Sequence, residues 1–224
     1  MKKVVLYTAR FSSPGRFRTH TSSLPAEDRI YYTDIDVEEG CHQMIPVGKD
    51  RTVKNDFYYI KKMNLNYISI PIKRQRFVKI CIPDELFDNY EYSIYADIKR
   101  PITSNFDSMI SFLQDGSDFL IRTHPERDCA YKEAEFLLRK NRYDNSDILK
   151  QVEFYKKEGF PTHSGLYWSA QLFRRHTKEL KEFSKLWWEQ VERFSYRDQI
   201  SLPYVVWKTG IKISGKPRRE WRKI

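Results

Sequence analysis

The chain has 224 residues and a formal net charge of +10, because 40 Lys and Arg residues outnumber 30 Asp and Glu residues. Hydrophobic residues make up 40% of the sequence and aromatic residues 15%, which is enough apolar material for the core of one domain and argues against wholesale disorder. No apolar run approaches the roughly 18 residues that a membrane span needs. The positive charge leaves three classes of partner open: nucleic acid, an anionic membrane surface and a phosphorylated small molecule.

The cysteines and the N-terminus indicate the cellular setting. Cys41, Cys81 and Cys129 are odd in number and lie far apart, as expected for reduced thiols in the cytoplasm rather than for a disulfide framework. The N-terminus has neither the long apolar stretch nor the small-residue cleavage site of a signal peptide. Cys41 and His42 are adjacent, but no C-x-x-C or H-x-x-x-H spacing accompanies them, so a zinc site is disfavoured. We expect a cytoplasmic protein.

The first half of the chain is predicted to be rich in strands. The apolar residues 3–9 predict a buried strand near the N-terminus, and a polar loop follows over residues 10–25. Shorter runs predict further strands at residues 29–33, 57–60, 67–70 and 92–96, with a basic segment at 71–79 and a helical turn at 83–87. A strand followed by a loop is the usual opening of an α/β nucleotide-binding sheet.

The second half is predicted to be mostly helical. Apolar residues recur at spacings of three and four over residues 128–140, 147–158 and 178–194. Two capping-box patterns accompany these segments, Thr123 with Glu126 and Ser195 with Asp198.

The chain ends in a run of basic residues. Residues 212–224 carry six cations and are expected to be a solvated extension that favours the inner face of a membrane. There is no internal repeat and no Gly/Ser linker. We therefore expect one domain over residues 1–211, followed by a basic tail over residues 212–224.

Several common catalytic motifs are absent. The sequence has no G-x-x-x-x-G-K-[ST], G-x-G-x-x-G, G-x-S-x-G or H-E-x-x-H, which disfavours P-loop, Rossmann, hydrolase-elbow and zincin chemistry. The strongest local candidate is Asp97, which follows a predicted strand and would project into the crevice where α/β sheets hold a cation or a ribose hydroxyl. Arg76 and Lys79 could neutralise a diphosphate from one helical face. The plain alternative is that Asp97 caps a turn and both cations are solvated.

Two later segments are further candidates. His124 and Arg127 could contact phosphate or sugar, although the capping-box interpretation of the same segment needs no ligand. Residues 158–166 form a loop with two glycines, which could shape a pocket or could simply end a helix.

Together these motifs resemble a family of glycosyltransferase-like domains. That family includes plant domains linked to mucilage and turgor, and bacterial and large-virus enzymes that build surface polysaccharides. The resemblance runs from about Arg76 to Ile211 and rests on the order of many short motifs: Arg76-x-x-Lys79, Asp97, His124-Pro125-x-Arg127, Glu158-Gly159-x-Pro161, Gly165-Leu166, Arg174-x-His176, Trp187-Trp188, Ser195-x-Arg197-Asp198-Gln199, Tyr204 and Trp207.

The resemblance implies a fold and an activity. The fold would be α/β and GT-A-like, with a nucleotide-binding mixed sheet flanked by helices and a helix-rich C-terminal half. The activity would be transfer of a sugar from a nucleotide-sugar donor, with a UDP-sugar favoured, to a glycan or lipid-linked acceptor in surface polysaccharide synthesis.

The resemblance also assigns donor-site residues. It places Asp97 where such enzymes keep a metal-binding Asp-x-Asp, and Mn²⁺ or Mg²⁺ is the implied cofactor. This sequence reads Asp97-Ile98-Lys99, so only one acid is present, and Lys99 could supply positive charge in place of a tightly held cation. Metal dependence therefore stays open. The full set of implied donor-binding residues is Thr8, Ala9, Asp34, Arg76, Lys79, Asp97 and Lys99.

On the acceptor side, the resemblance makes Asp198 the base that takes a proton from the attacking hydroxyl, preferably in an inverting reaction. A positioned base typically contributes ~100- to 10,000-fold in rate. The residues expected to contact the acceptor or a phosphate are His124, Arg127, His163, Gly165, Trp168 and Arg197.

Two alternatives remain. An inactive domain that binds a sugar nucleotide is compatible with the incomplete Asp-x-Asp. A nucleic-acid-binding protein would use the net charge and the aromatic residues as a basic stacking surface. However, Lys and Arg are spread through the chain and no nucleic-acid-binding motif appears, so we expect no nucleic-acid partner.

Overall fold

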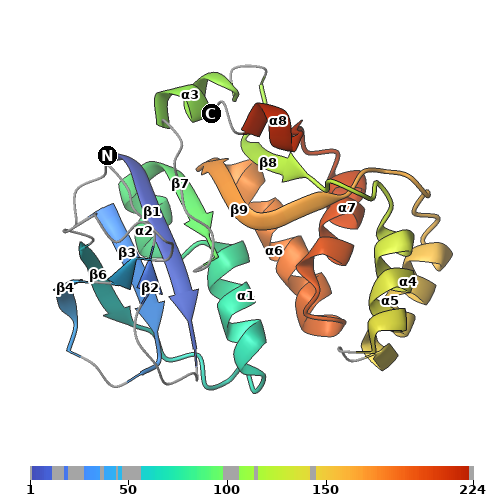
Figure 1. Cartoon of the computed structure of the whole chain (residues 1–224), viewed down its shortest axis with the longest axis horizontal. Coiled ribbons are helices and arrows are strands. Elements are labelled where there is room, and N and C mark those ends of the chain that lie inside the picture. Colours follow the sequence, from blue (N-terminus) through green and yellow to red (C-terminus); the bar gives the residue numbers. More distant parts are fainter. Residues whose placement is uncertain are drawn as a thin grey trace.

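In the computed structural model, the described residues are 2–11, 18–19, 28–35, 38–43, 45–46, 57–97, 106–113, 116–141 and 145–221. They form an eight-stranded sheet with helices packed against it (Figure 1). Lys99 and most of the predicted polar loop over residues 10–25 lie outside the described residues.

The sheet is mixed, with the strand order β10-β8-β9-β7-β1-β3-β6-β4. Its four central parallel strands are β7 (Tyr90–Ala96), β1 (Lys2–Arg10), β3 (Arg29–Thr33) and β6 (Phe57–Lys62). On one side, β9 (Tyr167–Arg175) runs antiparallel to β7 and to β8 (Phe119–Thr123), and β10 (Ile213–Lys216) is parallel to β8. On the other side, β4 (Gly40–Gln43) is antiparallel to β6, while β2 (Arg18–Thr19) and β5 (Ile45–Pro46) form a separate pair.

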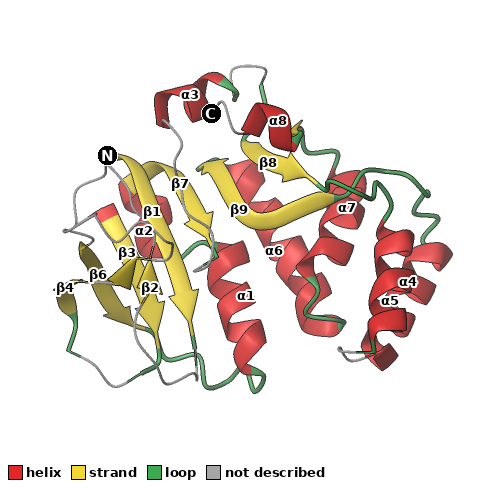
Figure 2. Cartoon of the chain, in the orientation of Figure 1, coloured by secondary structure: helices red, strands yellow, loops and turns green. Residues whose placement is uncertain are grey.

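Two apolar cores lie on the two faces of this sheet. Strand β1 alternates between them, because Val5 belongs to the larger core and Leu6 to the smaller one. Such a strand, buried on both faces, reads as a continuous apolar run, which is why the sequence predicts it well. The helices (Figure 2) are α1 (Pro71–Cys81), α2 (Asp84–Asn89), α3 (Phe106–Ser111), α4 (Ala130–Lys140), α5 (Asn145–Lys157), α6 (Lys178–Arg193), α7 (Asp198–Thr209) and α8 (Arg218–Trp221).

The chain reverses its direction of travel across the sheet at β1. From β1 it moves outward through β3 to β6, and it then returns to place β7 on the opposite side of β1. In open α/β sheets, ligands bind in the crevice at such a switch point, outside the carboxyl ends of the strands. The ends of β1 and β7 are therefore the first place to look for a site.

Most of the predicted elements are confirmed. The predicted strands at residues 3–9, 29–33, 57–60 and 92–96 are β1, β3, β6 and β7, and the three predicted helices are α4, α5 and α6. The C-terminal half is rich in helices, as expected, but it also supplies β8, β9 and β10. The basic segment at residues 71–79 is the body of helix α1, and the helical turn at 83–87 is part of α2.

The predicted strand at residues 67–70 is wrong. These residues form a turn in which the backbone N–H of Ile68 donates to the carbonyl of Leu65 at 2.9 Å. The turn leads directly into α1, whose first turn contains Pro71, a residue suited to the start of a helix. Tyr67 is 73% exposed, so the alternation of apolar residues here does not mark a buried sheet face.

Both predicted capping boxes are also wrong. Thr123 ends β8, and the next residue continues the sheet ladder, since His124 N–H donates to Leu166 O at 2.8 Å. Helix α4 begins only at Ala130. At the second site, Ser195 Oγ accepts from the N–H of Arg197, two residues on, and so forms a tight turn before α7 instead of capping the helix.

The C-terminal segment is not the solvated extension that its charge suggests. Residues Ile213–Lys216 form β10, which covers the outer edge of β8. Beyond it, Trp221 is buried in the smaller core, and its indole N–H donates to Gln171 Oε1 at 3.1 Å. An uncovered strand edge invites aggregation, so this segment has a structural role. Within the described part of the chain, no helix has the length and apolar character to cross a bilayer.

Candidate active site

The carboxyl ends of β1 and β7, with the neighbouring helix α1, bring several of the predicted donor-site residues together. Asp97 directly follows β7, and its backbone N–H donates to Ala170 O at 2.8 Å. This bond extends the ladder between β7 and β9 and fixes the backbone of Asp97 at the edge of the sheet. The prediction that Asp97 directly follows a strand is therefore confirmed, and this strand end lies beside the switch point of the sheet.

The side chain of Asp97 is held from one side. Its Oδ1 accepts from the Tyr95 hydroxyl at 3.0 Å and from Gln75 Nε2 at 3.2 Å. Gln75 Nε2 also donates to the Tyr95 hydroxyl, and Gln75 Oε1 accepts from Arg76 Nη1. Burial, and then the charge of Asp97, raise the pKa of Tyr95 well above its ordinary value, so this hydroxyl stays protonated and can donate.

A buried carboxylate, Asp198, lies beneath this network at the first position of α7. Its Oδ2 accepts from Lys79 Nζ at 2.5 Å and from Ser169 Oγ at 3.1 Å, while its Oδ1 is 3.6 Å from Arg76 Nε. Burial alone would raise the pKa of Asp198, but Arg76 and Lys79 together lower it well below its ordinary value. Asp198 is therefore ionised and is a weak proton acceptor, which opposes its predicted role as the base.

The two predicted diphosphate cations differ in their access to a ligand. The side chain of Lys79 is 1% exposed and is paired with Asp198, so it serves to tie α1 to α7. The side chain of Arg76 is 12% exposed, and it also donates to Tyr196 O at 3.3 Å. Arg76 is thus the cation of this pair that can reach a diphosphate.

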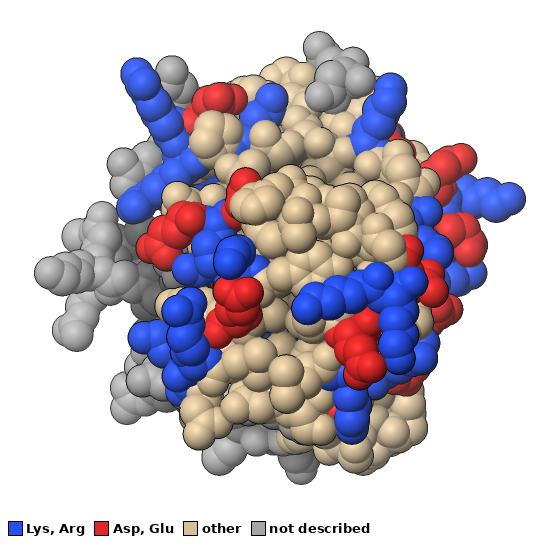
Figure 3. Space-filling model, turned by 90° about the vertical axis from the view of Figure 1, so that its right-hand side faces the viewer, with Lys and Arg blue, Asp and Glu red and all other residues tan. Residues whose placement is uncertain are grey.

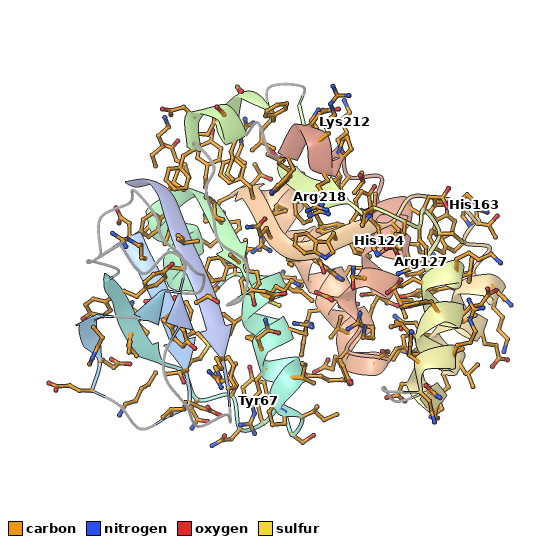
Figure 4. All side chains as sticks on the ribbon, viewed as in Figure 1. Tyr67, His124, Arg127, His163, Lys212 and Arg218 are labelled. Atoms are coloured by element: carbon orange, nitrogen blue, oxygen red, sulfur yellow. The ribbon has the colours of Figure 1, made fainter. Side chains whose placement is uncertain are left out.

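A second cluster joins two predicted acceptor-site residues that lie far apart in the sequence. The buried carboxylate of Glu133 accepts from Arg127 Nε at 2.7 Å and lies 3.9 Å from Arg197 Nη2. His124 Nδ1 accepts from the backbone N–H of Arg127 at 3.1 Å. Burial and the charge of Arg127 lower the pKa of His124, so its ring is neutral near pH 7. Figure 4 shows His124 and Arg127 close to the start of α4.

Three other predicted donor-site residues make contacts that stabilise the fold. Thr8 is buried, and its hydroxyl donates to Ala96 O at 2.7 Å, which ties β1 to β7. Ala9 is part of the larger core. Asp34 accepts from Arg74 Nη1 at 3.1 Å at the end of β3.

The residues predicted from the 158–166 loop and from β9 lie nearer the second cluster. His163 is on the surface, with its Nδ1 2.9 Å from Asp128 Oδ1, and Figure 4 places it at the outer end of the molecule. Gly165 has φ = 88°, a conformation that favours glycine. The Arg122 guanidinium lies over the ring of Trp168, with its Cζ atom 4.4 Å from the ring centroid.

Sequence reasoning missed Gln75, Tyr95 and Glu133. Tyr95 could have been found, because the two-residue period of a strand puts it on the same side as Asp97. Gln75 is an amide inside a run of cations, which is a weaker signal. Glu133 has no such signal, because the sequence of an amphipathic helix does not show which of its acidic residues is buried.

A divalent cation fits this site only together with a substrate. Among the residues that the structure describes, no group of three or more His, Cys, Asp and Glu side chains could hold a metal ion. Asp97 offers one carboxylate. Magnesium is commonly held by one or two carboxylates plus substrate phosphates, so Asp97 suits a cation that arrives with a diphosphate.

Comparisons with known proteins identify a family that matches most of this chain. Residues 63–218 match the family model described as TOD1/MUCI70, glycosyltransferase-like domain. A protein of Arabidopsis thaliana named "Probable hexosyltransferase MUCI70" is 32% identical over 130 residues, or 54% of this chain. The chain spans only 22% of the length of that relative. The matched region contains Gln75, Asp97, Glu133 and Asp198, and it leaves out β1, β3 and β6.

Proposed function

The chain belongs to the TOD1/MUCI70 glycosyltransferase-like family, and from this premise we propose that it transfers a sugar from a nucleotide-sugar donor to an acceptor. The proposed donor is a UDP-sugar, and the name of the plant relative, a probable hexosyltransferase, favours a hexose as the sugar. The proposed acceptor is a glycan or a lipid-linked sugar in surface polysaccharide synthesis.

One observation carries the proposal. Arg76 and Asp97, a partly accessible cation and a strand-end carboxylate, lie at the switch point of an α/β sheet and are linked through Gln75. A nucleoside diphosphate needs both kinds of group, since its phosphates require positive charge while its ribose or its bound cation requires an acceptor oxygen.

The chemistry is displacement at the anomeric carbon of the sugar, with the nucleoside diphosphate as the leaving group. Negative charge grows on the diphosphate as the bond to the sugar breaks, and Arg76 is placed to stabilise it. Asp97 would hold Mn²⁺ or Mg²⁺ jointly with the diphosphate, and the cation would supply further neutralisation of that charge.

Asp198 enters this proposal as an anchor. Its two oxygens bind Lys79, Ser169 and Arg76. Asp198 thereby positions the Arg76 guanidinium, which is proposed to face the diphosphate. As the base, it would first have to leave these partners, because they suppress its affinity for a proton.

The second cluster is proposed as the acceptor side of the site. Arg127 and Arg197, held by Glu133, would contact polar or anionic groups of the acceptor, and Trp168, whose ring lies against the Arg122 guanidinium, would contact a sugar beside them. His163 lies further out, on the surface loop, and would contact only a long acceptor.

A panel of nucleotide sugars tests the function directly. Thermal unfolding is followed with UDP-, GDP- and ADP-sugars, with and without Mn²⁺, and release of nucleoside diphosphate is measured for each. A donor at 100 times its Kd stabilises the protein by about 2.7 kcal/mol. A rise in Tm with one class of donor, together with release of its nucleoside diphosphate, supports the proposal. No shift with any donor would count against it.

An inactive sugar-nucleotide-binding domain is the second candidate. It is favoured by the single acid at the Asp-x-Asp position and by the closed ion pairs of Asp198. Donor hydrolysis or sugar transfer above the uncatalysed rate would exclude it. Nucleic-acid binding gains no support from the face in Figure 3, where acidic side chains lie among the basic ones and no continuous basic stripe is visible.

A further inference from the structure

Gln75 joins the two charged groups of the proposed donor site. It lies on α1, and its Oε1 accepts a hydrogen bond from Arg76 Nη1. Its Nε2 donates to Asp97 Oδ1 at 3.2 Å and also to the Tyr95 hydroxyl. An amide nitrogen has two hydrogens, so both donors and the acceptor oxygen of Gln75 are engaged.

The neighbours of Gln75 allow only one orientation of its amide. Rotation by 180° would turn Oε1 toward the Asp97 carboxylate and Nε2 toward the Arg76 guanidinium, which opposes acceptor to acceptor and donor to donor. The same arrangement keeps Arg76 and Asp97 apart. Without the intervening amide, the cation and the carboxylate would attract each other into a direct ion pair and neutralise the two groups that a ligand needs.

Tyr95 supplies the second contact to the same oxygen of Asp97. Its hydroxyl donates to Oδ1 at 3.0 Å, and its buried ring packs edge-on against Tyr7 with 5.4 Å between the centroids. Two donors therefore meet at Oδ1, whereas no hydrogen bond from the described part of the chain reaches Oδ2. A carboxylate bound through one oxygen presents its other oxygen in a fixed direction.

We infer that Gln75 and Tyr95 are positioning residues that hold Asp97 through Oδ1, so that Oδ2 is presented to the divalent cation of a cation–nucleoside diphosphate complex. The inference rests on the proposed function, because the diphosphate supplies the other ligands of the cation. Losing a hydrogen-bond partner of a metal-binding side chain typically weakens metal binding by ~10- to 100-fold.

Titration of the full chain with Mn²⁺ tests this inference without an activity assay. Loss of the electron paramagnetic resonance signal of free Mn²⁺ is followed with UDP, with GDP, with ADP and with no nucleotide, and calorimetry gives the nucleotide affinity with and without Mn²⁺. Gln75→Leu and Tyr95→Phe each remove one donor to Oδ1. Each is expected to weaken binding of the Mn²⁺–nucleotide complex by ~10-fold or more.

Helix α5 offers a matched control. There Gln151 Nε2 donates to the Tyr155 hydroxyl at 2.8 Å, and both side chains are buried. Gln151→Leu and Tyr155→Phe therefore remove the same kind of buried bond away from the sheet edge, and both are expected to keep the wild-type affinity within about twofold. Tyr95→Phe preserves the packing of its ring, so it serves as the test even if Gln75→Leu fails to fold.

The outcomes separate the inference from the function on which it rests. Wild-type affinity in Tyr95→Phe and in folded Gln75→Leu would overturn the inference, as would an equal loss in the α5 variants or nucleotide binding that is independent of Mn²⁺. None of these results removes the proposed donor site. Failure of the wild-type chain to bind any of the three nucleoside diphosphates, with or without Mn²⁺, would instead overturn the proposed function.

Discussion

At the scale of single residues, Asp198 is bound on both oxygens, by Lys79 and Ser169 on one and by the nearby Arg76 on the other. Removing one member of a buried ion pair leaves the remaining charges without compensation, which costs about 3–5 kcal/mol. Replacing a carboxylate that acts only as a base would leave the free energy of unfolding nearly unchanged. The two roles therefore make opposite predictions for stability.

Asp198→Asn is predicted to lower the free energy of unfolding by about 3–5 kcal/mol, because Lys79 and Arg76 remain buried without their counter-charge. Denaturant unfolding at pH 7 measures this loss. The double variant Lys79→Met/Asp198→Asn is expected to regain part of it, since it removes the stranded cation as well. An Asp198→Asn protein as stable as wild type, but unable to transfer sugar, would restore Asp198 as the base.

His176 is predicted to make stability depend on pH. Its Nδ1 donates to Tyr90 O at 2.7 Å, and burial lowers the pKa of its ring to about 4 from the ordinary 6.5. Between pH 6.5 and pH 4, His176 is protonated in the unfolded chain but neutral in the folded chain. The free energy of unfolding is therefore highest above pH 6.5 and declines as the pH falls toward 4. Between pH 6.5 and pH 5 the expected loss is about 2 kcal/mol.

Denaturant unfolding of wild type and His176→Asn at pH 7 and at pH 5 checks this prediction. The variant is expected to start lower at pH 7, because it lacks the bond of the imidazole to Tyr90, and to lose less on acidification. Parallel losses in the two proteins would show that His176 is not the titrating group.

At the scale of elements, helix α1 depends on a buried arginine from β9. Arg174 is completely buried, and it donates to Lys79 O at 2.9 Å and to Ile80 O at 3.0 Å in the last turn of α1. These carbonyls have no partner within the helix, and a cation there also complements the helix dipole. Arg174 therefore fixes the helix that carries Gln75 and Arg76.

Arg174→Met is predicted to lower the free energy of unfolding by about 2–5 kcal/mol, because Ile80 O loses the Arg174 donor and Lys79 O keeps only its bond from the Tyr7 hydroxyl. Arg175→Met is the matched control. Its guanidinium lies 3.7 Å from Asp118 in a partly exposed ion pair, and its loss should cost less than about 1 kcal/mol. Equal stability losses in the two variants would argue against the capping role.

The limits of sequence reasoning are clearest in β9 and in the ion pairs. Strands β1 and β7 could be predicted because they are nearly continuous apolar runs, whereas β9 mixes Ser, Gln and two Arg with its apolar residues and hides the fully buried Arg174. Arg76, Lys79, Asp97 and Asp198 could each be named from motifs. The sequence does not show which cation pairs with which acid. Lys79 and Asp198 are 119 residues apart, and they meet only because α1 and α7 both pack against α6.

At the scale of the whole molecule, the two cores are closed by the chain's last described residues. Strand β10 covers the edge of β8, and Trp221 of α8 is part of the smaller core. The basic residues of this segment suggest a solvated extension. Its Ile and Trp side chains instead pack against the rest of the protein.

A chain cut after Ile211 is predicted to be markedly less stable and more prone to aggregate, because it exposes the edge of β8 and empties the site of Trp221. Trp221→Ala isolates the second effect and should cost about 3–5 kcal/mol. Thermal unfolding and light scattering measure both consequences. A shortened chain with the wild-type Tm would return residues 212–224 to the role of a solvated extension.

The fold is proposed to position Arg76 against the diphosphate of the donor. Substitution of Arg76 is therefore the most direct test. The measurement is the rate at which wild type and Arg76→Met release nucleoside diphosphate from the nucleotide sugar that wild type uses best. Loss of one group that stabilises developing charge typically costs ~100- to 1,000-fold in kcat, and a loss of that size in a variant that is less stable but still folded at the assay temperature is the expected result. Equal rates in the two proteins would contradict a donor site at the carboxyl ends of β1 and β7.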